Sequence, residues 1–197
     1  VGEAGDRARR EDGAAGDHGT GVLAHVARES AYGGVRSRGT IGGSIAPADR
    51  AADGPVALTA LGASVEIAGP SARRTVAVED FVLGMFETAL EPDELVVGVT
   101  IPKLGRNARW SYFKVRRKAG AFADALAAVV FDPDRGTARV AVGGVATELK
   151  RIEALECCLS DGADQDTTAE RIDAALAAIN PEMDAFHHRL PQICPLS

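Results

Sequence analysis

Residues 123–143 read ADALAAVVFDPDRGTARVAVG, and this stretch decides the fold class of the chain. Its two apolar runs, 123–131 and 137–143, are rich in alanine and valine and are typical of buried strands. Residues 132–136 (DPDRG) lie between them and combine proline, aspartate and glycine, which favours a tight turn. The stretch therefore predicts an antiparallel hairpin, and residues 110–116 (WSYFKVR) predict one more strand before it.

The segments on either side of this hairpin complete the predicted fold. Upstream, the apolar spacing predicts two helices and three strands, the helices at 21–30 and 55–61 and the strands at 65–67, 75–78 and 94–101. Downstream, it predicts two helices, at 149–159 and 168–179. The predicted strands follow one another and the last two helices come after them, so strands and helices do not alternate. This order favours an α+β fold over a doubly wound parallel sheet.

Composition narrows the possible functions. The chain has 197 residues, of which 46% are hydrophobic, and a net charge of −6, which argues against a nucleic-acid surface. Its three cysteines form no CxxC pair, so a disulfide framework and a zinc site are not expected. This cysteine usage favours a cytoplasmic location. No apolar run reaches the roughly 18 residues of a membrane span.

The chain divides into three predicted segments. Residues 1–21 consist largely of glycine, alanine and charged residues, so we expect them to be disordered or to be a fragment end. Residues 22–106 form a small α+β domain, and Gly105-Arg106-Asn107 marks its end. Residues 107–197 form a C-terminal domain of antiparallel strands packed with helices.

A glycine-rich stretch at residues 36–53, RSRGTIGGSIAPADRAAD, is the candidate binding segment. Its glycines and the hydroxyls of Thr40 and Ser44 could form a backbone nest for a pyrophosphate. The stretch matches neither GxGxxG nor a Walker loop. Asp49 and Asp53 would share one helix face if residues 48–60 were helical, and a carboxylate there could accept hydrogen bonds from sugar hydroxyls. A tight turn without a ligand is the alternative interpretation.

The same stretch resembles the second FAD-binding motif of a known family, the flavoprotein (medium) subunits of molybdenum hydroxylases, which include carbon monoxide dehydrogenase and xanthine dehydrogenase. Other segments resemble the family in the same order. They are LTALGASVEIAGPSARRTVAVEDFVLG, TALEPDELVVGVTIP, YFKVRRKAGAFADALAAVVF and ARVAVGGVATELKRIEALE. The resemblance covers at least residues 22–160.

The resemblance implies a set of cofactor-binding residues. The family's Thr-Ile-Gly-Gly motif corresponds to residues 40–44, which would wrap the FAD pyrophosphate and ribityl chain, and Asp53 would bind cofactor hydroxyls. Val96 is expected against the flavin ring, and Lys114 near its pyrimidine edge, where a cation would stabilise the reduced flavin. The complete predicted FAD site is Thr40, Ile41, Gly42, Gly43, Ser44, Asp53, Val96 and Lys114. No catalytic residue and no metal ligand is predicted on this chain.

The resemblance also implies partners. It indicates an oxidoreductase component in which the molybdenum cofactor and two [2Fe-2S] clusters lie on other chains, a molybdopterin large subunit and an iron–sulfur small subunit. Electrons would pass from the clusters by way of FAD to NAD or another acceptor. This chain lacks the cysteines that the clusters need.

The sequence departs from the family at three places. Residues 1–21 contain no counterpart of the family's first glycine-rich FAD motif, Ser37 stands where the family has asparagine, and residues 85–88 (MFET) stand where the family has Tyr-Arg-Lys-Thr. Glu87 thus places a negative charge where the family has a lysine. These departures leave a second hypothesis open, a divergent or truncated family member that binds no FAD and acts as an interaction module or remnant.

Overall fold

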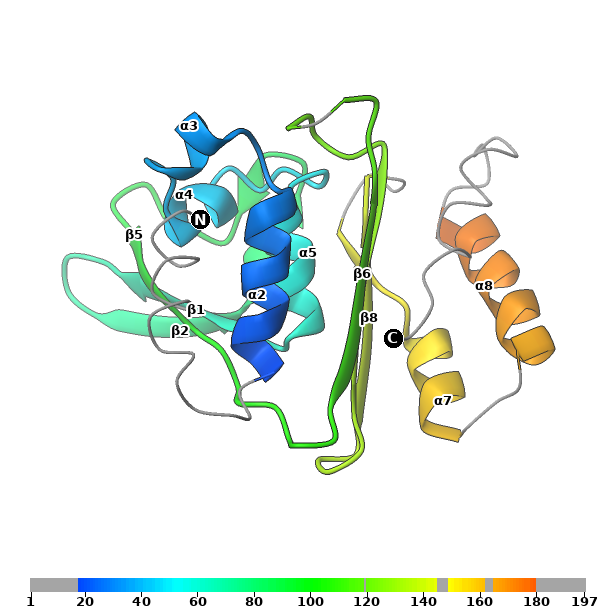
Figure 1. Ribbon diagram of the computed structural model, residues 1–197. Coiled ribbons are helices and arrows are strands. Elements are labelled where there is room, and N and C mark those ends of the chain that lie inside the picture. The colour runs from blue at the N-terminus through cyan, green and yellow to red at the C-terminus, as the bar shows by residue number, and fades with distance from the viewer. Residues whose placement is uncertain (1–17, 119, 145–148, 162–164, 180–197) are drawn as a thin grey trace.

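The computed structural model describes residues 18–118, 120–144, 149–161 and 165–179. Within them, the chain forms a three-stranded sheet, a four-stranded sheet and a small two-stranded hairpin, with helices between the two larger sheets and on the far side of the four-stranded one (Figure 1). The α+β fold class predicted from the sequence is confirmed. None of the helices in these residues is long and apolar enough to cross a membrane.

The first sheet has three strands in the order β2-β1-β5. Strands β1 (Ser64–Ala68) and β2 (Arg73–Ala77) form an antiparallel hairpin, and β5 (Leu95–Thr100) pairs antiparallel with β1. These three strands match the predicted ones to within a few residues. Between β2 and β5 the chain forms a short helix, α6 (Val78–Phe81), and a small hairpin of β3 (Val82–Gly84) and β4 (Glu87–Thr88).

The second sheet is a four-stranded antiparallel meander in the order β6-β7-β8-β9. It contains residues 123–143. Strands β7 (Ala125–Asp132) and β8 (Thr137–Gly143) pair through the predicted turn, with Asp132 opposite Thr137. Strand β6 (Arg109–Val115) pairs with β7, and the short β9 (Lys150–Arg151) pairs with β8.

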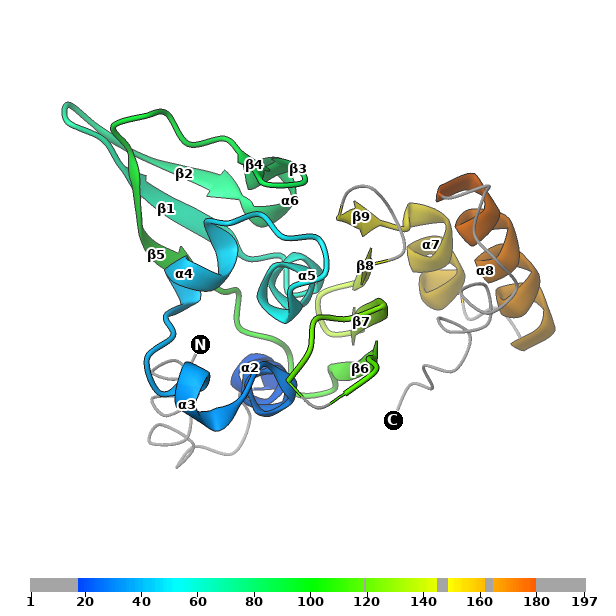
Figure 2. The same cartoon turned by 90° about the horizontal axis from the view of Figure 1, so that it is seen from above.

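Helix α5 (Asp53–Ala60) lies between the two sheets (Figure 2). It is apolar on every side, as expected of a fully buried helix. Leu58 packs into a core with Ile67 and Phe81 of the first sheet region. Val56 and Ala60 pack instead with Leu126, Ala141 and other residues of the second sheet. One helix therefore supplies side chains to two cores.

Other helices cover the outer faces. Helix α2 (His18–Glu29) joins the core between α5 and β6–β8 through Val22 and Val26. On the opposite face of this sheet, α7 (Glu153–Asp161) packs through Leu155 and Cys158, and α8 (Gln165–Ile179) packs next to α7. Two very short helices, α3 (Gly33–Arg36) and α4 (Ile41–Ile45), connect α2 to α5.

Two predicted element boundaries differ from the structure. Helix α2 spans His18–Glu29, where the sequence predicted a helix at 21–30. Residues 150–151 are the strand β9 and not the start of the helix predicted at 149. The domain boundary after residue 106 stays a prediction; it falls between the two sheets, and the core formed with α2 and α5 contains residues from both sides of it. Residues 1–17 lie outside the described residues.

Candidate functional site

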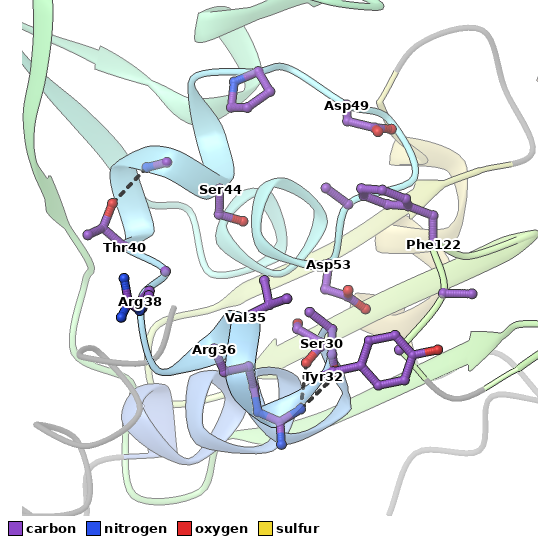
Figure 3. Close-up of a pocket in the computed structure, with 17 residues that line it drawn as sticks. Ser30, Tyr32, Val35, Arg36, Arg38, Thr40, Ser44, Asp49, Asp53 and Phe122 are labelled. Atoms are coloured by element: carbon purple, nitrogen blue, oxygen red, sulfur yellow. Dashed lines mark hydrogen bonds between the residues drawn. The ribbon is translucent and has the colours of Figure 1, made fainter.

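A pocket of about 530 Å³ opens beside the N-terminus of α5. It is bounded by the end of α2, by α3 and α4, by the turn that precedes α5, and by the loop 120–122 between β6 and β7 (Figure 3). Small-molecule and cofactor sites commonly have volumes of about 300–1,000 Å³. Ten residues of the glycine-rich stretch line the pocket, among them Thr40, Gly43, Ser44, Asp49 and Asp53.

The glycine-rich stretch forms a short helix, not the turn or open nest expected from its glycines. Thr40 is the N-cap of α4, and its Oγ1 accepts a hydrogen bond from the N–H of Gly43 at 3.0 Å. Ile45 at the other end is fully buried and anchors the helix in the first core. Burial of Ile45 and the threonine cap therefore offset the low helix propensity of two glycines.

Asp49 and Asp53 come together by a different route from the predicted one. The helix begins at Asp53, and Asp49 lies in the preceding turn, where its Oδ1 accepts a hydrogen bond from the N–H of Ala51 at 2.9 Å. The two carboxylates therefore share no helix face. Both line the pocket because the turn folds back over the N-terminus of α5.

Asp53 is the most heavily bonded polar group in the pocket. Its carboxylate receives the ammonium of Lys114, with Nζ 2.8 Å from Oδ1 and 2.9 Å from Oδ2. Both side chains are almost fully buried, at 3% exposure for Lys114 and 8% for Asp53. The hydroxyl of Tyr112 donates a short hydrogen bond to the same carboxylate. We call Asp53, Tyr112 and Lys114 the buried triad.

The phenol of Tyr112 is a hydrogen-bond donor in this triad. Burial, followed by the nearby carboxylate of Asp53, raises the pKa of Tyr112 far above its usual range. Its ring also makes an edge contact with His25 of α2, with the ring centroids 5.9 Å apart. Tyr112 and Lys114 are two residues apart on β6 and therefore point to the same face of the strand, toward α5.

The pocket has a polar end and an aromatic end. Figure 3 places Arg38 and Thr40 together on one side, and Tyr32 and Phe122 on the other. Tyr32 and Phe122 are 54% and 65% exposed, which is unusual for aromatic rings unless they meet a ligand or a partner. Tyr32 lies over Gly120, where a Cβ atom would come within 2.7 Å of the ring.

Arg36 stabilises the wall between these ends. Its guanidinium donates to the carbonyl oxygens of Ser30 and Ala31 at 2.8 and 2.7 Å. Ala31 has a positive φ of 46°, which is unfavourable for a residue with a side chain. The two hydrogen bonds satisfy carbonyl groups at the end of α2 and hold the chain in this sharp turn.

The predicted site residues fall into two groups. Thr40, Gly43, Ser44 and Asp53 line the pocket. Ile41, Gly42, Val96 and Lys114 do not line it. Ile41 and Val96 pack against the first core, and a Cβ on Gly42 would lie 3.5 Å from Val96 Cγ1, so Val96 supports α4 from behind.

Sequence reasoning missed the remaining part of the pocket. Tyr32, Arg38 and Phe122 were not predicted, although two exposed aromatics in a chain with only 5% aromatic residues could have signalled them. Glu87, the charge reversal, lies on the β3–β4 hairpin and is not among the lining residues of the described chain. Cys158 is buried and Cys157 is exposed. His187, His188 and Cys194 lie outside the described residues.

Comparison with known proteins decides the family. Residues 14–104, which include α2 to β5 and most of the pocket, match the family model described as the FAD binding domain in molybdopterin dehydrogenase. These residues belong to this family. The resemblance inferred from the glycine-rich stretch is thereby confirmed, and the match begins eight residues before the predicted start at Val22.

Individual relatives extend the similarity into the second sheet. The chain is 35% identical over 167 residues to the carbon monoxide dehydrogenase medium chain of Hydrogenophaga pseudoflava, covering 83% of this chain and 58% of the relative. It is 34% identical over 160 residues to the nicotine 6-hydroxylase medium subunit of Paenarthrobacter nicotinovorans, covering 80% and 55%. The chain thus spans little more than half the length of these relatives.

A solved structure gives the same result. The carbon monoxide dehydrogenase from Hydrogenophaga pseudoflava that lacks the Mo-pyranopterin moiety contains a chain that superposes with a TM-score of 0.79 at 34% identity. The superposition covers 87% of this chain and 64% of that chain. The similarity therefore includes both sheets and the helix between them.

Proposed function

We propose that this chain is the FAD-binding part of the medium subunit of a molybdenum hydroxylase. The observation that carries the proposal is the coincidence of the pocket with the family's FAD-binding domain. Fourteen of the residues that line the pocket, from Ser30 to Asp53, lie within the 36–53 stretch or just before it, and all of these fall inside the matched residues 14–104.

The residues present fit FAD in size and in chemistry. The aromatic end offers Tyr32 and Phe122 to a flat ring system. The polar end offers the guanidinium of Arg38 and the hydroxyls of Thr40 and Ser44 to phosphate or ribityl oxygens. Gly43 also lines the pocket and lies beside Thr40, to whose Oγ1 its N–H donates. The predicted roles of Thr40, Gly43, Ser44 and Asp53 are thus compatible with their positions.

The chain's own contribution is to bind and orient the cofactor. FAD supplies electron-transfer chemistry when it is bound, and the protein around it supplies position and electrostatics. We propose that the subunit connects the iron–sulfur clusters of a small subunit with NAD or another acceptor, and that a molybdopterin large subunit completes the complex. We also propose a cytoplasmic location, on the basis of the cysteine usage.

The proposal is tested by titrating the purified chain with FAD and following flavin fluorescence. Gly43→Val should abolish binding, because its Cβ would lie 3.1 Å from Thr40 Oγ1 and the rest of the side chain would enter the pocket. Gly34→Ala is the matched control, since a Cβ there meets no atom within 4 Å. Circular dichroism checks that both variants fold. Equal binding by Gly43→Val and the control would count against this site.

The same titration separates the proposal from its rival. A divergent member that serves as an interaction module would bind no FAD, even at concentrations that saturate other family members. We expect measurable binding of low affinity, because the family's first glycine-rich motif has no counterpart in this chain and its contacts would be missing. Supplying that subdomain from a relative should tighten binding.

A further inference from the structure

We propose that Tyr112 and Lys114 are positioning residues that hold Asp53 in the pocket and cancel its charge, so that an anionic cofactor can bind beside it. This inference rests on the proposed function. It differs from the role implied by the family resemblance, in which Lys114 itself would meet the flavin ring.

The geometry of the buried triad leaves Lys114 little freedom to act on a ligand. Its Nζ lies within 2.9 Å of both oxygens of Asp53, and its side chain is only 3% exposed. It does not line the pocket, whereas Asp53 does. Lys114 therefore reaches the pocket only through the carboxylate that it holds.

The charge of Asp53 explains why such a partner is needed. A buried carboxylate without a cation is strongly destabilising, and the cost arises mainly from the missing partner. In this pocket an unpaired carboxylate would also repel the phosphates of a dinucleotide. With Lys114 in place the pair carries no net charge, and Asp53 still has lone pairs available for the hydroxyl groups of a ligand.

Tyr112 sets the direction of the carboxylate. Its hydroxyl donates to Oδ1, and its ring is held by the edge contact with His25. The donor comes from β6, and Tyr112 is not among the described residues that line the pocket. Removing it would leave the ion pair but release the carboxylate to rotate. We therefore expect Tyr112→Phe to have a smaller effect than loss of Lys114.

The other charged groups near the triad do not replace Lys114. Arg36 is engaged with two carbonyl oxygens of the α2–α3 connection, and Arg38 lies on the polar end of the pocket. Arg116 pairs with Glu29 of α2 at 2.7 Å. Asp49 adds a second carboxylate to the pocket. With Lys114 removed, two carboxylates would face the ligand and no cation would contact Asp53.

A double-mutant cycle tests the inference. FAD affinity is measured for the unmodified chain, Lys114→Met, Asp53→Asn and the double variant. Lys114→Met should lose on the order of tenfold in affinity, equivalent to about 1.4 kcal/mol. The double variant should bind no worse than Asp53→Asn alone, because without the carboxylate Lys114 has nothing to position.

Two controls make each outcome decisive. Lys103→Met removes an exposed lysine in the segment after β5 and should leave affinity unchanged. Urea unfolding of the same variants gives a readout without FAD, in which Asp53→Asn should restore the stability lost in Lys114→Met. If Lys114→Met weakens binding equally with and without Asp53, the lysine acts on the cofactor directly and the inference is wrong. Failure of the unmodified chain to bind FAD would overturn the proposed function instead, together with the cofactor part of this inference, while the unfolding cycle would still test the triad.

Discussion

Gly143 lies where the turn before α5, which borders the pocket, packs directly against the second sheet. It ends β8, and a Cβ at this position would collide with the carbonyl oxygen of Arg50 and come within 2.7 Å of Val56 Cγ2. Arg50 belongs to the turn before α5, and the N–H of Gly144 donates to its carbonyl at 3.0 Å. A glycine here allows the turn that carries Asp49 to rest directly on the sheet.

We expect Gly143→Ala to destabilise the chain by about 1–3 kcal/mol, the usual cost of forcing an extra carbon into a packed interior. Chemical denaturation measures the change. Gly34→Ala, in open space, serves as the control and should be close to neutral. A Gly143→Ala variant as stable as the control would mean that this contact is looser than the distances indicate.

The Arg74–Glu94 pair predicts a pH effect at a single residue. The hydrogen bond from Arg74, followed by that from the backbone N–H of Glu91, lowers the pKa of Glu94 to about 2 from its ordinary 4.5. Because the folded pKa is lower than the unfolded one, the pair's contribution to stability is present above about pH 4.5 and is lost as the pH falls toward 2.

Glu94→Gln should therefore flatten the acid limb of the stability curve between these two pH values. The measurement is the free energy of unfolding against pH for both proteins. The effect is small, because the pair is exposed to solvent and screened by salt. Glu87→Gln removes an exposed carboxylate outside this pair and should leave the curve of the unmodified chain in place.

At the scale of elements, α5 is the most sensitive part of the fold. Leu58 is fully buried and packs with Ile67 and Phe81. We expect Leu58→Ala to cost about 2–5 kcal/mol, the range seen when a buried leucine leaves a cavity. Leu83→Ala removes the same atoms from a side chain that is 51% exposed and should cost far less. Thermal unfolding of the two variants gives the comparison.

The sequence predicted the elements whose pattern is local. Strands β6, β7 and β8 were found because alternating and β-branched runs are bounded by turn residues, and α5 was found because its apolar residues follow a proline. Strand β9 was missed because two residues carry no periodicity. The short helix α4 was missed because its glycines argue against a helix, and only burial of Ile45 in the tertiary structure reverses that preference.

The candidate site was predicted only in part for the same reason. Thr40, Gly43, Ser44 and Asp53 lie in one continuous motif that the sequence displays. The ion pair between Asp53 and Lys114 joins residues 61 positions apart, and no spacing rule predicts such a contact. Phe122 enters the pocket from a loop that follows β6, so its role depends on how the second sheet packs against α5.

At the scale of the whole molecule, several large apolar side chains are exposed to solvent. They include Leu83, Met85 and Phe86 on the β3–β4 hairpin, and Leu95 and Val97 on the edge strand β5. If the chain is a subunit of a larger complex, such residues are candidates for contact with partner chains or with the rest of the medium subunit.

We therefore expect the isolated chain to self-associate in a concentration-dependent way. Light scattering during size-exclusion chromatography measures this, and Phe86→Ser together with Leu95→Ser should reduce it without lowering the melting temperature. Co-expression with iron–sulfur and molybdopterin subunits should recover a stable complex. A clean monomer that recovers no partner would favour the rival hypothesis of an interaction module or remnant.

The position of α5 between two sheets also limits where the protein chain can be divided or opened. A break after residue 106 would leave Val56 and Ala60 without the strands that cover them, and would leave Leu126 and Ala141 of the other fragment facing water. Two such fragments are expected to be insoluble apart and to recombine when produced together. Duplication or exchange of a segment, or circular permutation, should therefore be tolerated when the chain is opened at the β1–β2 hairpin, whose arginines are exposed. The same changes should not be tolerated when the chain is opened after residue 106, at the predicted domain boundary.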